Sequence, residues 1–598
     1  MKLLSPIQLS VWIAVAIAGV SQSAASAATI AVTNPMPADR DVADGTCTLR
    51  EAIIAANSRA AYHGCAAGGS GTNTIRLPAG SYALTTELPT VQSNVHVVGS
   101  GYARTTINGS GRAGMRFAGV DDALTDVTIR QFIGSAVTVM AGADVTMSAV
   151  SFVDNGEATS QGTDIHNSGT TRVWSGSFTT AVFSFNSLIR NEASGSISLV
   201  NVSLFNSASE HSIIYNAGGS VGLFNATVGG NTDTASGVIH NDAPGTLSIS
   251  FSTIAFNTAK LKRGSAILNS GGTVDVQGSI ILGLPGGGPT CAGTINSGGY
   301  NVFDAASPCA PLAAGDTVTS TPNLDTSGSK LLPKPHGGIG PVYLPLAGSP
   351  AIGRVDPSFC GNVDARGGGR PQWPLNCASG AVDVAEAWVV VGNVNALTAG
   401  DRNIVTQLQG IFDSSRVRII SDATTAGPAL GAIVLSGSVS DARVTTHYRN
   451  MTGGVVVLKP SLFDEMNMTN SSATTSEGTT TANALNILAT DFFNSGSRAG
   501  FTSGGYASGN DPVLTTSSVS YGWGAAGGFA DADAAIRGAS THFGIFRYAP
   551  GETMFHSFVA PGNRVGFFAT DAAAAVLTTA GNRLLQEAVL VGSLPKVP

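Results

Sequence analysis

Histidine, arginine and tyrosine side chains recur at a regular spacing in the first half of the chain, and together they could bind or process a sugar. His166, Arg190, Tyr215 and His240 each stand between an isoleucine and an asparagine, at steps of 24, 25 and 25 residues. Rings of this kind stack on sugars, and His and Arg donate hydrogen bonds to hydroxyl groups. The alternative is an ordinary exposed row on a strand, which accepts almost any side chain.

The elements that position these residues follow from a repeat of about 25 residues. Short alternating β-type segments separated by Gly and Asn turns, at a period in the mid-twenties, are typical of a solenoid. Helical repeats are excluded because no 3.6-residue periodicity lies between the turns, and the leucine-rich repeat pattern is absent. We therefore predict a mainly β protein, a right-handed parallel β-helix with one coil per period and coils stacked about 4.8 Å apart.

We expect the recurring asparagines to be structural. Stacked amides can donate and accept along the coils as a ladder, and Asn tolerates the left-handed backbone of a sharp corner. The isoleucine two residues before each asparagine should point inward with it, and the residue between them outward. The two predicted ladders comprise Asn167, Asn191, Asn216, Asn241 and Asn269, and Asn155, Asn206, Asn231 and Asn257.

A glycosidase is the enzymatic alternative, because polysaccharide-degrading β-helices exist and use paired carboxylates as acid and base. The string Asn231-Thr232-Asp233 matches one motif of the polygalacturonase-like enzymes. The Asp121-Asp122 pair precedes that motif instead of following it, and no Arg-Ile-Lys partner follows. Clustered Asp for calcium beside a basic residue, as a lyase needs, has equally little support. We expect no catalytic residues, no cofactor and no metal.

Charge and the N-terminal segment indicate the compartment. With 31 Lys and Arg against 38 Asp and Glu, the net charge of −7 excludes the basic surface that nucleic-acid binding needs. Lys2, an apolar run at 11–20 and the small residues at 25–27 predict a cleavable signal over residues 1–27. An uncleaved anchor is the alternative, although the run is short for a bilayer. No second membrane-spanning run follows, so we expect a secreted or cell-surface protein.

Six cysteines form three local couples, 18, 18 and 17 residues apart. An even count in an exported chain favours disulfides, although six cysteines allow 15 pairings. We expect pairing within each couple, and a zinc site is disfavoured because no CxxC spacing accompanies them. The couples are Cys47 and Cys65, Cys291 and Cys309, and Cys360 and Cys377.

The segment 48–57 predicts a short helix with Thr48 as its N-cap and Glu51 completing a capping box. Its apolar face, with Leu49, Ile53 and Ile54, could cover the open end of a solenoid. Residues 47–52 resemble the CSLREA motif of secreted bacterial proteins, and residues 74–85 resemble the first strand of that family. The resemblance implies an exported right-handed parallel β-helix with no established general activity and an N-terminal cap over residues 28–95.

Residues 344–353 and 360–386 resemble the closing segment of the choice-of-anchor type Q proteins. The motif is an Asp-x-Arg-Gly-x-x-Arg-Pro string, here Asp364, Arg366 and Arg370, followed by a cysteine and a Gly-Ala-x-Glu string. Asp383 stands where the family usually has Glu. The resemblance covers roughly residues 35–386 and implies that the β-helix spans 28–386, with its closing segment at 340–386.

After residue 386, apolar strand runs alternate with helical segments. A strand over 387–393 precedes a helix over 398–412 with Thr398 as N-cap. This alternation predicts an α/β domain with a mostly parallel sheet over residues 387–598. The domain resembles the flavodoxin-like domain of the class I glutamine-amidotransferase and ThuA-like superfamily.

The second domain lacks the nucleophile of that superfamily. The position of its catalytic cysteine is occupied here by Lys459, Pro460 and Ser461, and no cysteine follows Cys377, which excludes thiol amidotransfer. Ser461 is a weak candidate nucleophile without an obvious His-Asp partner. We expect packing or surface roles for the scattered histidines and a non-catalytic binding or structural module: His447, His542 and His556.

Together these observations predict an exported structural or binding protein that interacts with glycans, envelope components or other proteins. The alternative is a carbohydrate-active enzyme, a lyase or glycosidase that uses the β-helix groove. The expected partners are carbohydrates or cell-envelope components, with no nucleic acid and no transmembrane segment after signal cleavage. The ligand, the mode of surface attachment and the oligomeric state do not follow from the sequence.

Overall fold

The computed structural model describes most of the chain after the predicted signal, of which residues 1–26 lie outside the described residues. The structure describes residues 27–33, 39–92, 94–112, 114–156, 163–180, 183–184, 186–233, 237–260, 264–285, 288–328, 331–334, 338–346, 348–367, 370, 376–383, 386–412, 416–424, 431–470, 474–488, 511–527 and 530–592.

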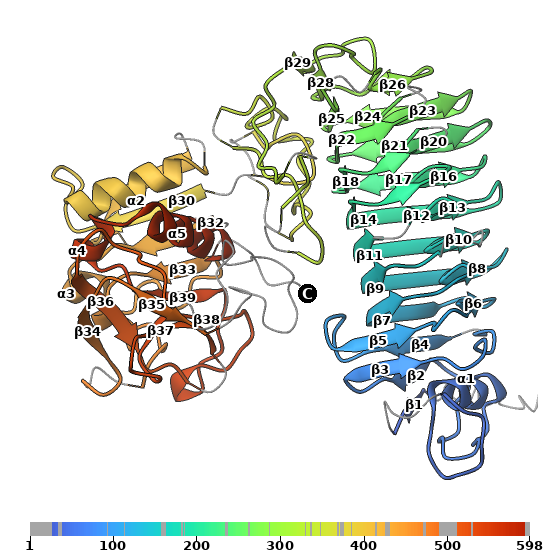
Figure 1. Cartoon of the computed structure of the whole chain (residues 1–598), viewed down its shortest axis with the longest axis horizontal. Helices are drawn as coiled ribbons and strands as arrows, with labels where there is room; N and C mark the ends of the chain where they lie inside the picture. Colours follow the sequence, from blue (N-terminus) through green and yellow to red (C-terminus); the bar gives the residue numbers. More distant parts are fainter. Residues whose placement is uncertain are drawn as a thin grey trace, which may run out of the picture.

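The first half of the chain is a parallel β-helix (Figure 1). Each coil contributes one short strand to an eight-stranded parallel sheet, and longer strands bend across the other faces. The eight-stranded sheet contains β6 (Met115–Phe117), β8 (Val137–Val139), β10 (Ile165–Asn167), β13 (Ile189–Asn191), β16 (Ile214–Asn216), β20 (Ile239–Asp242), β23 (Ile267–Ser270) and β26 (Cys291–Ala292).

The remaining faces of the β-helix form one connected 21-stranded sheet. Its strands are β1 (Ala28–Ala31), β2 (Asn73–Arg76), β3 (Gly80–Ala83), β4 (Val95–Val98), β5 (Thr105–Asn108), β7 (Asp122–Arg130), β9 (Asp144–Val153), β11 (Thr170–Thr179), β12 (Phe183–Ser184), β14 (Ser196–Phe205), β15 (Ala208–Ser209), β17 (Ser220–Phe224), β18 (Thr227–Gly229), β19 (Thr232–Asp233), β21 (Thr246–Ser250), β22 (Thr253–Ala259), β24 (Thr273–Gln277), β25 (Ile280–Gly283), β27 (Asn296–Ser297), β28 (Val302–Asp304) and β29 (Thr317–Thr319).

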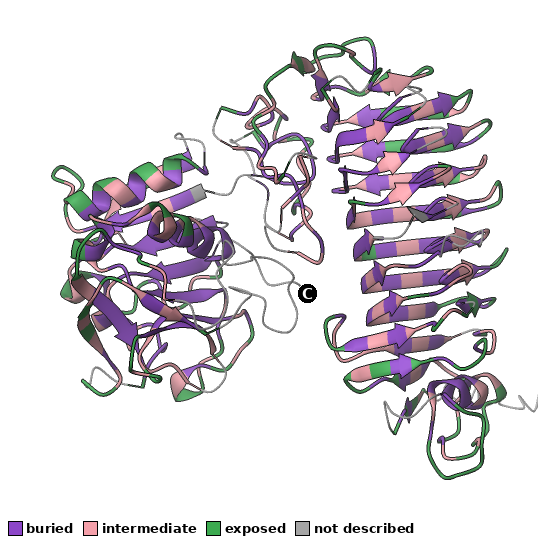
Figure 2. Ribbon diagram, viewed as in Figure 1, coloured by how far each residue is buried: buried purple, intermediate pink, exposed green. Residues whose placement is uncertain are grey.

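Register explains the 25-residue period. Ile189 pairs with Ile214 and Asn191 with Asn216 in adjacent strands, and the isoleucine row is fully buried. Alternation therefore turns each isoleucine and asparagine into the core and the residue between them outward. The strands accordingly alternate between buried and partly exposed residues along their length (Figure 2).

The first row of asparagines forms a continuous hydrogen-bonded ladder inside the coils. Each side-chain Nδ2 donates to the Oδ1 of the next coil, from Asn167 through Asn191, Asn216 and Asn241 to Asn269, at 2.7, 2.9, 2.7 and 3.1 Å. The amides also donate to backbone carbonyls at the turn, such as that of Gly219. A Cβ on Gly219 would lie 2.5 Å from Asn191 Nδ2, so the ladder requires a glycine beside it.

The second row forms the predicted side-chain bond at one step, where Asn231 Nδ2 donates to Asn257 Oδ1 at 3.2 Å, and it also binds backbone N–H groups. One predicted member is wrong. Asn257 Oδ1 accepts from the backbone N–H of Asn231, and Asn231 Oδ1 accepts from the N–H of Ser207, both at 3.0 Å. Ser207 therefore occupies the stacked position, while Asn206 is exposed one residue earlier. Asn155 makes the same kind of bond to the N–H of Phe132 at 3.2 Å.

The corners of the coils do not use the ladder asparagines, contrary to the expectation that these residues also serve as left-handed positions. All nine predicted ladder residues are described, and among them Asn206 alone has a positive φ, 48°. The long strands bend instead at one residue per coil, and side chains of several kinds occupy that position. These residues are Asp126, Ala149, Ser175, Asn201, Asn225 and Phe251, with φ between 47° and 59°.

A helix packs on the first coils. α1 (Leu49–Ser58) has the capping box of Thr48 and Glu51, and it contacts β1, β2 and β4. Leu49 and Ile53 are buried, whereas Ile54 is half-buried. The cysteines pair within each couple, as expected, and form Cys47–Cys65, Cys291–Cys309 and Cys360–Cys377.

Buried ion pairs lie within the described part of residues 340–386, the expected closing segment. Arg366 bonds to Asp364 Oδ2 through Nε and Nη2 at 3.0 and 2.7 Å, and both side chains are almost fully buried. Arg370 donates to Asn225 Oδ1 on the β-helix at 3.0 Å and lies 3.4 Å from Asp383 Oδ2. These contacts fasten the segment to the β-helix across a sequence distance of 145 residues.

The second domain is built on a mixed ten-stranded sheet (Figure 1). Its parallel strands lie in the order β31 (Val417–Ser421), β30 (Glu386–Val391), β32 (Gly431–Leu435), β33 (Gly454–Val457) and β39 (Arg564–Phe567). The strands that extend the sheet pair antiparallel, so the expected mostly parallel sheet is wrong for this half: β38 (Phe543–Tyr548), β36 (Val519–Gly524), β34 (Glu477–Ala482), β37 (Asp531–Ile536) and β35 (Leu485–Ile487).

Helices and loops cover both faces of this sheet. Val389 and Val434 pack on one face against α2 (Ala399–Gln409) and α5 (Thr579–Gly592), and Val390 and Ile433 pack on the other. The central strands are accordingly buried throughout (Figure 2). The short helices are α3 (Asp441–Val444), α4 (Asp571–Ala574), η2 (Pro460–Leu462) and η3 (Phe555–Ser557).

Asp164 should make the β-helix less stable at alkaline pH. Burial raises its pKa to about 7, against about 3.9 in an unfolded chain. The folded state therefore holds the proton more tightly, and the stabilisation, full below pH 4, is lost as the pH rises through 7. We expect this group to remove about 3 kcal/mol between pH 5 and pH 8. Guanidinium unfolding of Asp164→Asn at both values should show a flatter pH dependence, whereas Asp275→Asn, at an exposed site, should keep the wild-type one.

Candidate functional site

The four residues proposed from their spacing lie side by side on the outer face of the eight-stranded sheet. His166 pairs in register with Arg190, Arg190 with Tyr215, and Tyr215 with His240. All four are half-buried. Successive side chains are one strand spacing apart, about 4.8 Å.

Glu192 joins the first half of this row. Its Oε1 lies 2.8 Å from His166 Nε2 and accepts a hydrogen bond from Arg190 Nε at 2.6 Å. The guanidinium carbon of Arg190 lies 4.9 Å from the centre of the Tyr215 ring, within cation–π distance. One carboxylate thus links three successive coils through Arg190.

Asp242 joins the second half. Tyr215 donates its hydroxyl hydrogen to Asp242 Oδ2 at 2.6 Å, and His240 Nε2 lies 3.0 Å from Asp242 Oδ1. His240 Nε2 also lies 2.9 Å from Ser270 Oγ one coil farther on. We call the resulting network the outer strip, defined as His166, Arg190, Glu192, Tyr215, His240 and Asp242.

Sequence reasoning missed the two carboxylates of the outer strip. Glu192 and Asp242 directly follow the ladder residues Asn191 and Asn241. The signal that could have found them is an acidic residue two positions after an outward Arg or His, because i and i+2 share one face of a strand.

Protonation in the outer strip favours binding over proton transfer by the tyrosine. Burial, together with the Asp242 carboxylate, raises the pKa of Tyr215 to about 12, so it is a phenol at neutral pH. Burial lowers the pKa of His240, an effect that Asp242 opposes in part. Burial alone would raise the pKa of Glu192, but hydrogen bonds from Arg190 and His166 and their charges lower it. The strip therefore presents fixed hydrogen-bond donors and ionised acceptors.

The carboxylates of the glycosidase alternative are not brought together. Asp122 opens β7 and is buried, with Oδ1 accepting from Val95 N, whereas Asp233 ends β19 and is fully buried. Strand pairing from β7 through β9, β11 and β14 to β18 separates the two by four coils, about 19 Å along the axis. Glycosidase carboxylates stand about 5–10 Å apart, so this pair does not fit.

Ser461 in the second domain has a carboxylate partner. Its hydroxyl donates to Asp441 Oδ2 at 2.9 Å, and Lys459 Nζ lies 2.9 Å from Asp441 Oδ1. Of the scattered histidines, His542 stacks on Trp523 at 3.6 Å and His556 Nε2 lies 2.9 Å from the carbonyl of Asn470. His542 therefore packs on an aromatic side chain, whereas His556 lies at the surface.

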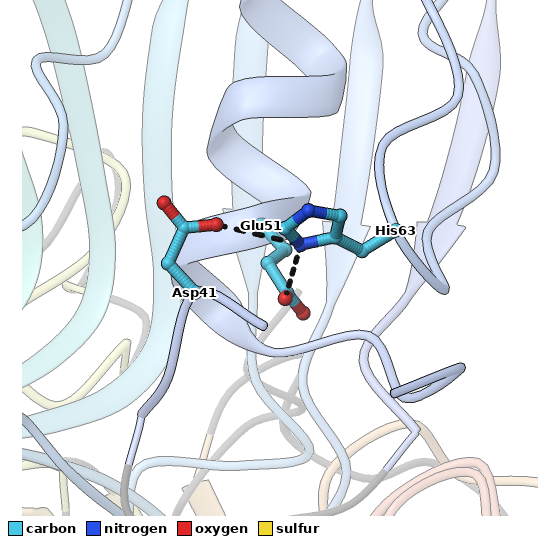
Figure 3. Close-up of side chains that lie close together, drawn as sticks. All are labelled: Asp41, Glu51 and His63. Atoms are coloured by element: carbon cyan, nitrogen blue, oxygen red, sulfur yellow. Dashed lines mark hydrogen bonds and ion pairs between the residues drawn. The ribbon is translucent and has the colours of Figure 1, made fainter. Parts of the chain in front are cut away.

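One group could hold a metal among the residues that the structure describes. His63 Nδ1 lies 2.8 Å from Glu51 Oε1 and 3.4 Å from Asp41 Oδ1, beside α1 (Figure 3). Glu51 already accepts from the backbone N–H groups of Val42 and Thr48. The contact between His63 and Glu51 therefore joins the loop around His63 to the helix.

No family model and no curated protein match the chain. Among solved structures, the chain is similar to the A-module of the mannuronan C-5 epimerase AlgE4 of Azotobacter vinelandii, at 13% identity over 45% of this chain and 92% of that one, with a TM-score of 0.22. The parallel β-helix rests on the strand register described above. Across the described part of the chain, no helix is both long and apolar enough to cross a membrane.

Proposed function

We propose that the chain is an exported, non-catalytic binding protein whose outer strip recognises glycans. The observation that carries this proposal is the continuous network from His166 to Ser270 across five coils. Such a network holds donors, acceptors and one aromatic ring in fixed positions, which lowers the entropic cost of ordering them around a ligand. The coil repeat is also close to the length of one sugar unit, so successive units can meet successive coils.

Charge balance favours a neutral, hydroxyl-rich glycan over a polyanion. His166 and Arg190 are both bound to Glu192, and His240 is bound to Asp242. The Arg190 guanidinium is therefore already compensated, and a polyanion would have to displace the Glu192 carboxylate from it. Hydroxyl groups can exchange hydrogen bonds with both kinds of side chain without that displacement.

Export is supported by the three disulfides, which are typical of proteins that fold in oxidising compartments. The resemblance of residues 47–52 and 360–386 to the CSLREA and choice-of-anchor type Q proteins supports the same proposal. We place α1 as the cap of the first coil and residues 340–386 as the closing segment on this basis.

The second domain is proposed to be a binding module of the flavodoxin-like type. The order of its parallel strands, 2-1-3-4-5 in chain order, is the order of doubly wound sheets of that type. The nucleophile position of the amidotransferase superfamily carries Ser461, whose hydroxyl is bound to Asp441. This contact supports a non-catalytic role.

A panel of oligosaccharides tests the proposed function. Mature protein is expected to bind at least one neutral hexasaccharide (cello-, manno- or laminarihexaose) more tightly than oligogalacturonate or oligomannuronate. Tyr215→Ala, which removes the ring and the bond to Asp242, should weaken that binding at least tenfold by isothermal titration calorimetry. Preferred binding of the acidic oligosaccharides would contradict the charge argument.

The same panel of oligosaccharides distinguishes binding from the enzymatic alternative. We expect no release of reducing ends and no unsaturated product from any of the oligosaccharides. Turnover that is lost in Glu192→Gln or Asp242→Asn would show instead that the outer strip is an active site.

A further inference from the structure

The second domain contains a cavity of about 590 Å³ at the carboxyl ends of its parallel strands. Its walls come from the loops after β32, β33 and β39 and from the antiparallel strands β34 and β36. In open α/β sheets, ligands bind outside the carboxyl ends of the strands, near the point where the strand order reverses. The order of the parallel strands places that reversal between β30 and β32, at the same edge of the sheet.

The one ammonium group that lines the cavity is already paired. Lys459 Nζ lies 2.9 Å from Asp441 Oδ1 and donates to the carbonyl of Val439 at 2.6 Å. Ser461 donates to the other oxygen of Asp441. This corner of the cavity is therefore neutral and offers no cation to an acidic ligand.

Two further carboxylates line the cavity without a cation. Glu477 is only 6% exposed and accepts a hydrogen bond from Thr469 Oγ1 at 2.8 Å. Asp571 accepts from Thr398 Oγ1 at 2.5 Å. Neither forms an ion pair with any residue that the structure describes, and Coulomb interactions are strong where water is partly excluded. Above pH 7 the cavity is consequently negative and would stabilise a positive ligand.

Hydroxyl groups provide the rest of the polar lining. Ser520 and Thr570 lie on the wall formed by β36 and the loop after β39, and Thr570 Oγ1 donates to the carbonyl of Ser520. Thr479 adds an exposed hydroxyl from β34. Hydroxyl side chains both donate and accept, so they suit a ligand that itself carries several hydroxyl groups.

We propose that this cavity binds a small hydroxylated ligand with a protonated amine, an amino sugar with a free amino group. The ammonium pairs with the carboxylates of Glu477 and Asp571, and the ligand hydroxyls exchange hydrogen bonds with Ser461, Ser520 and Thr479. The site is independent of the outer strip, which lies on the β-helix.

Glu477 also gives the site a pH dependence. Burial, with a contribution from the carboxylates of Asp464 and Asp441, raises its pKa to about 7, and burial raises that of the neighbouring Glu465 to about 8. Lys459 is the cation of this region and is bound to Asp441. Below pH 7 Glu477 becomes neutral, so binding of an ammonium ligand should weaken several-fold between pH 8 and pH 6.

Calorimetry on the full mature chain with glucosamine, N-acetylglucosamine and glucose tests the proposal at pH 8. Acetylation removes the charge while the ring and its hydroxyls stay, and at this pH a substantial share of free glucosamine amine is protonated. We expect glucosamine to bind at least tenfold more tightly than the other two sugars. Equal affinities for all three sugars, or no binding of glucosamine, would overturn the proposal.

Matched variants locate the site. Glu477→Gln and Asp571→Asn keep the acceptor for Thr469 and Thr398 but remove a charge, and each should weaken glucosamine binding at least fivefold. Asp511→Asn, on a surface carboxylate paired with exposed Arg537, should change it less than twofold. Tyr215→Ala on the β-helix should also leave it unchanged. Unaltered affinity in both cavity variants, with wild-type unfolding transitions, would place the ligand elsewhere.

Discussion

Replacing Arg370 by methionine is expected to destabilise the protein by about 3–5 kcal/mol, because it leaves a buried charge without its partner. The Arg370 side chain is fully buried and donates to the carbonyls of Ala378 and Gly380 at 3.0 and 2.7 Å and to Asn225 Oδ1. Arg370→Met would remove all of these bonds and leave Asp383, also buried, with Arg416 at 3.9 Å. Guanidinium unfolding should show the loss, and limited proteolysis should cleave within 340–386.

The charge argument can be separated from lost packing. Burial raises the pKa of Asp383, so the orphaned carboxyl in Arg370→Met should be easier to tolerate at pH 5 than at pH 8. The double variant Arg370→Met/Asp383→Asn should recover part of the stability. Arg402→Met, which removes an exposed arginine of α2, should stay within about 0.5 kcal/mol of wild type. An Arg370→Met protein as stable as Arg402→Met would show that the closing segment is not held by this pair.

Asn216→Ala is expected to lower the free energy of unfolding by about 2–4 kcal/mol. The Asn216 amide accepts from Asn191 at 2.9 Å and donates to Asn241 and to the carbonyls of Gly219 and Thr246. Alanine would leave these buried groups unsatisfied and open a small cavity in the middle of the stack. Chemical unfolding followed by circular dichroism of the β-structure measures the change.

An asparagine outside the ladder provides the control. Asn296→Ala removes an exposed amide that donates to the exposed Asp275, and we expect a change within about 0.5 kcal/mol. Equal stability of Asn216→Ala and Asn296→Ala would mean that the ladder contributes nothing measurable to the fold.

The repeat was the most informative part of the sequence. A fixed period with Ile and Asn two residues apart predicts stacked coils and buried amides, because strand alternation and register follow from it. The repeat spacing predicted Asn206 as a ladder residue, and this was wrong because a one-residue shift places Ser207 in the stack. The corners were also missed, since the bending position accepts residues as different as Ala149 and Phe251 and leaves no compositional signal.

The outer strip could be predicted only in part. Alternation from the isoleucine row gave His166 and Tyr215 the same outward direction, which register then bears out. The carboxylates of Glu192 and Asp242 were overlooked because each stands one residue beyond the repeated Ile-x-Asn motif. Their hydrogen bonds depend on side-chain reach between neighbouring coils, which spacing alone does not define.

Contacts between residues far apart in the chain could not be predicted from the sequence. The hydrogen bond from Arg370 to Asn225 joins residues 145 positions apart, so no local sequence pattern predicts it. The antiparallel half of the second sheet was missed because the composition of an apolar strand does not show whether it pairs parallel or antiparallel. The antiparallel pair β38 and β39 is an example. The cavity lined by Glu477 and Asp571 assembles from separate loops in the same way.

The most direct test of glycan binding at the outer strip is to measure the affinity of the best-bound neutral hexasaccharide for two variants. These are Tyr215→Ala, in the strip, and Trp174→Ala, outside it. Trp174 is an aromatic side chain on β11, in the other sheet of the β-helix, and is 48% exposed. Recognition by the outer strip predicts at least tenfold weaker binding for Tyr215→Ala and an unchanged affinity for Trp174→Ala. Equal affinities of wild type and Tyr215→Ala would contradict glycan binding at this strip.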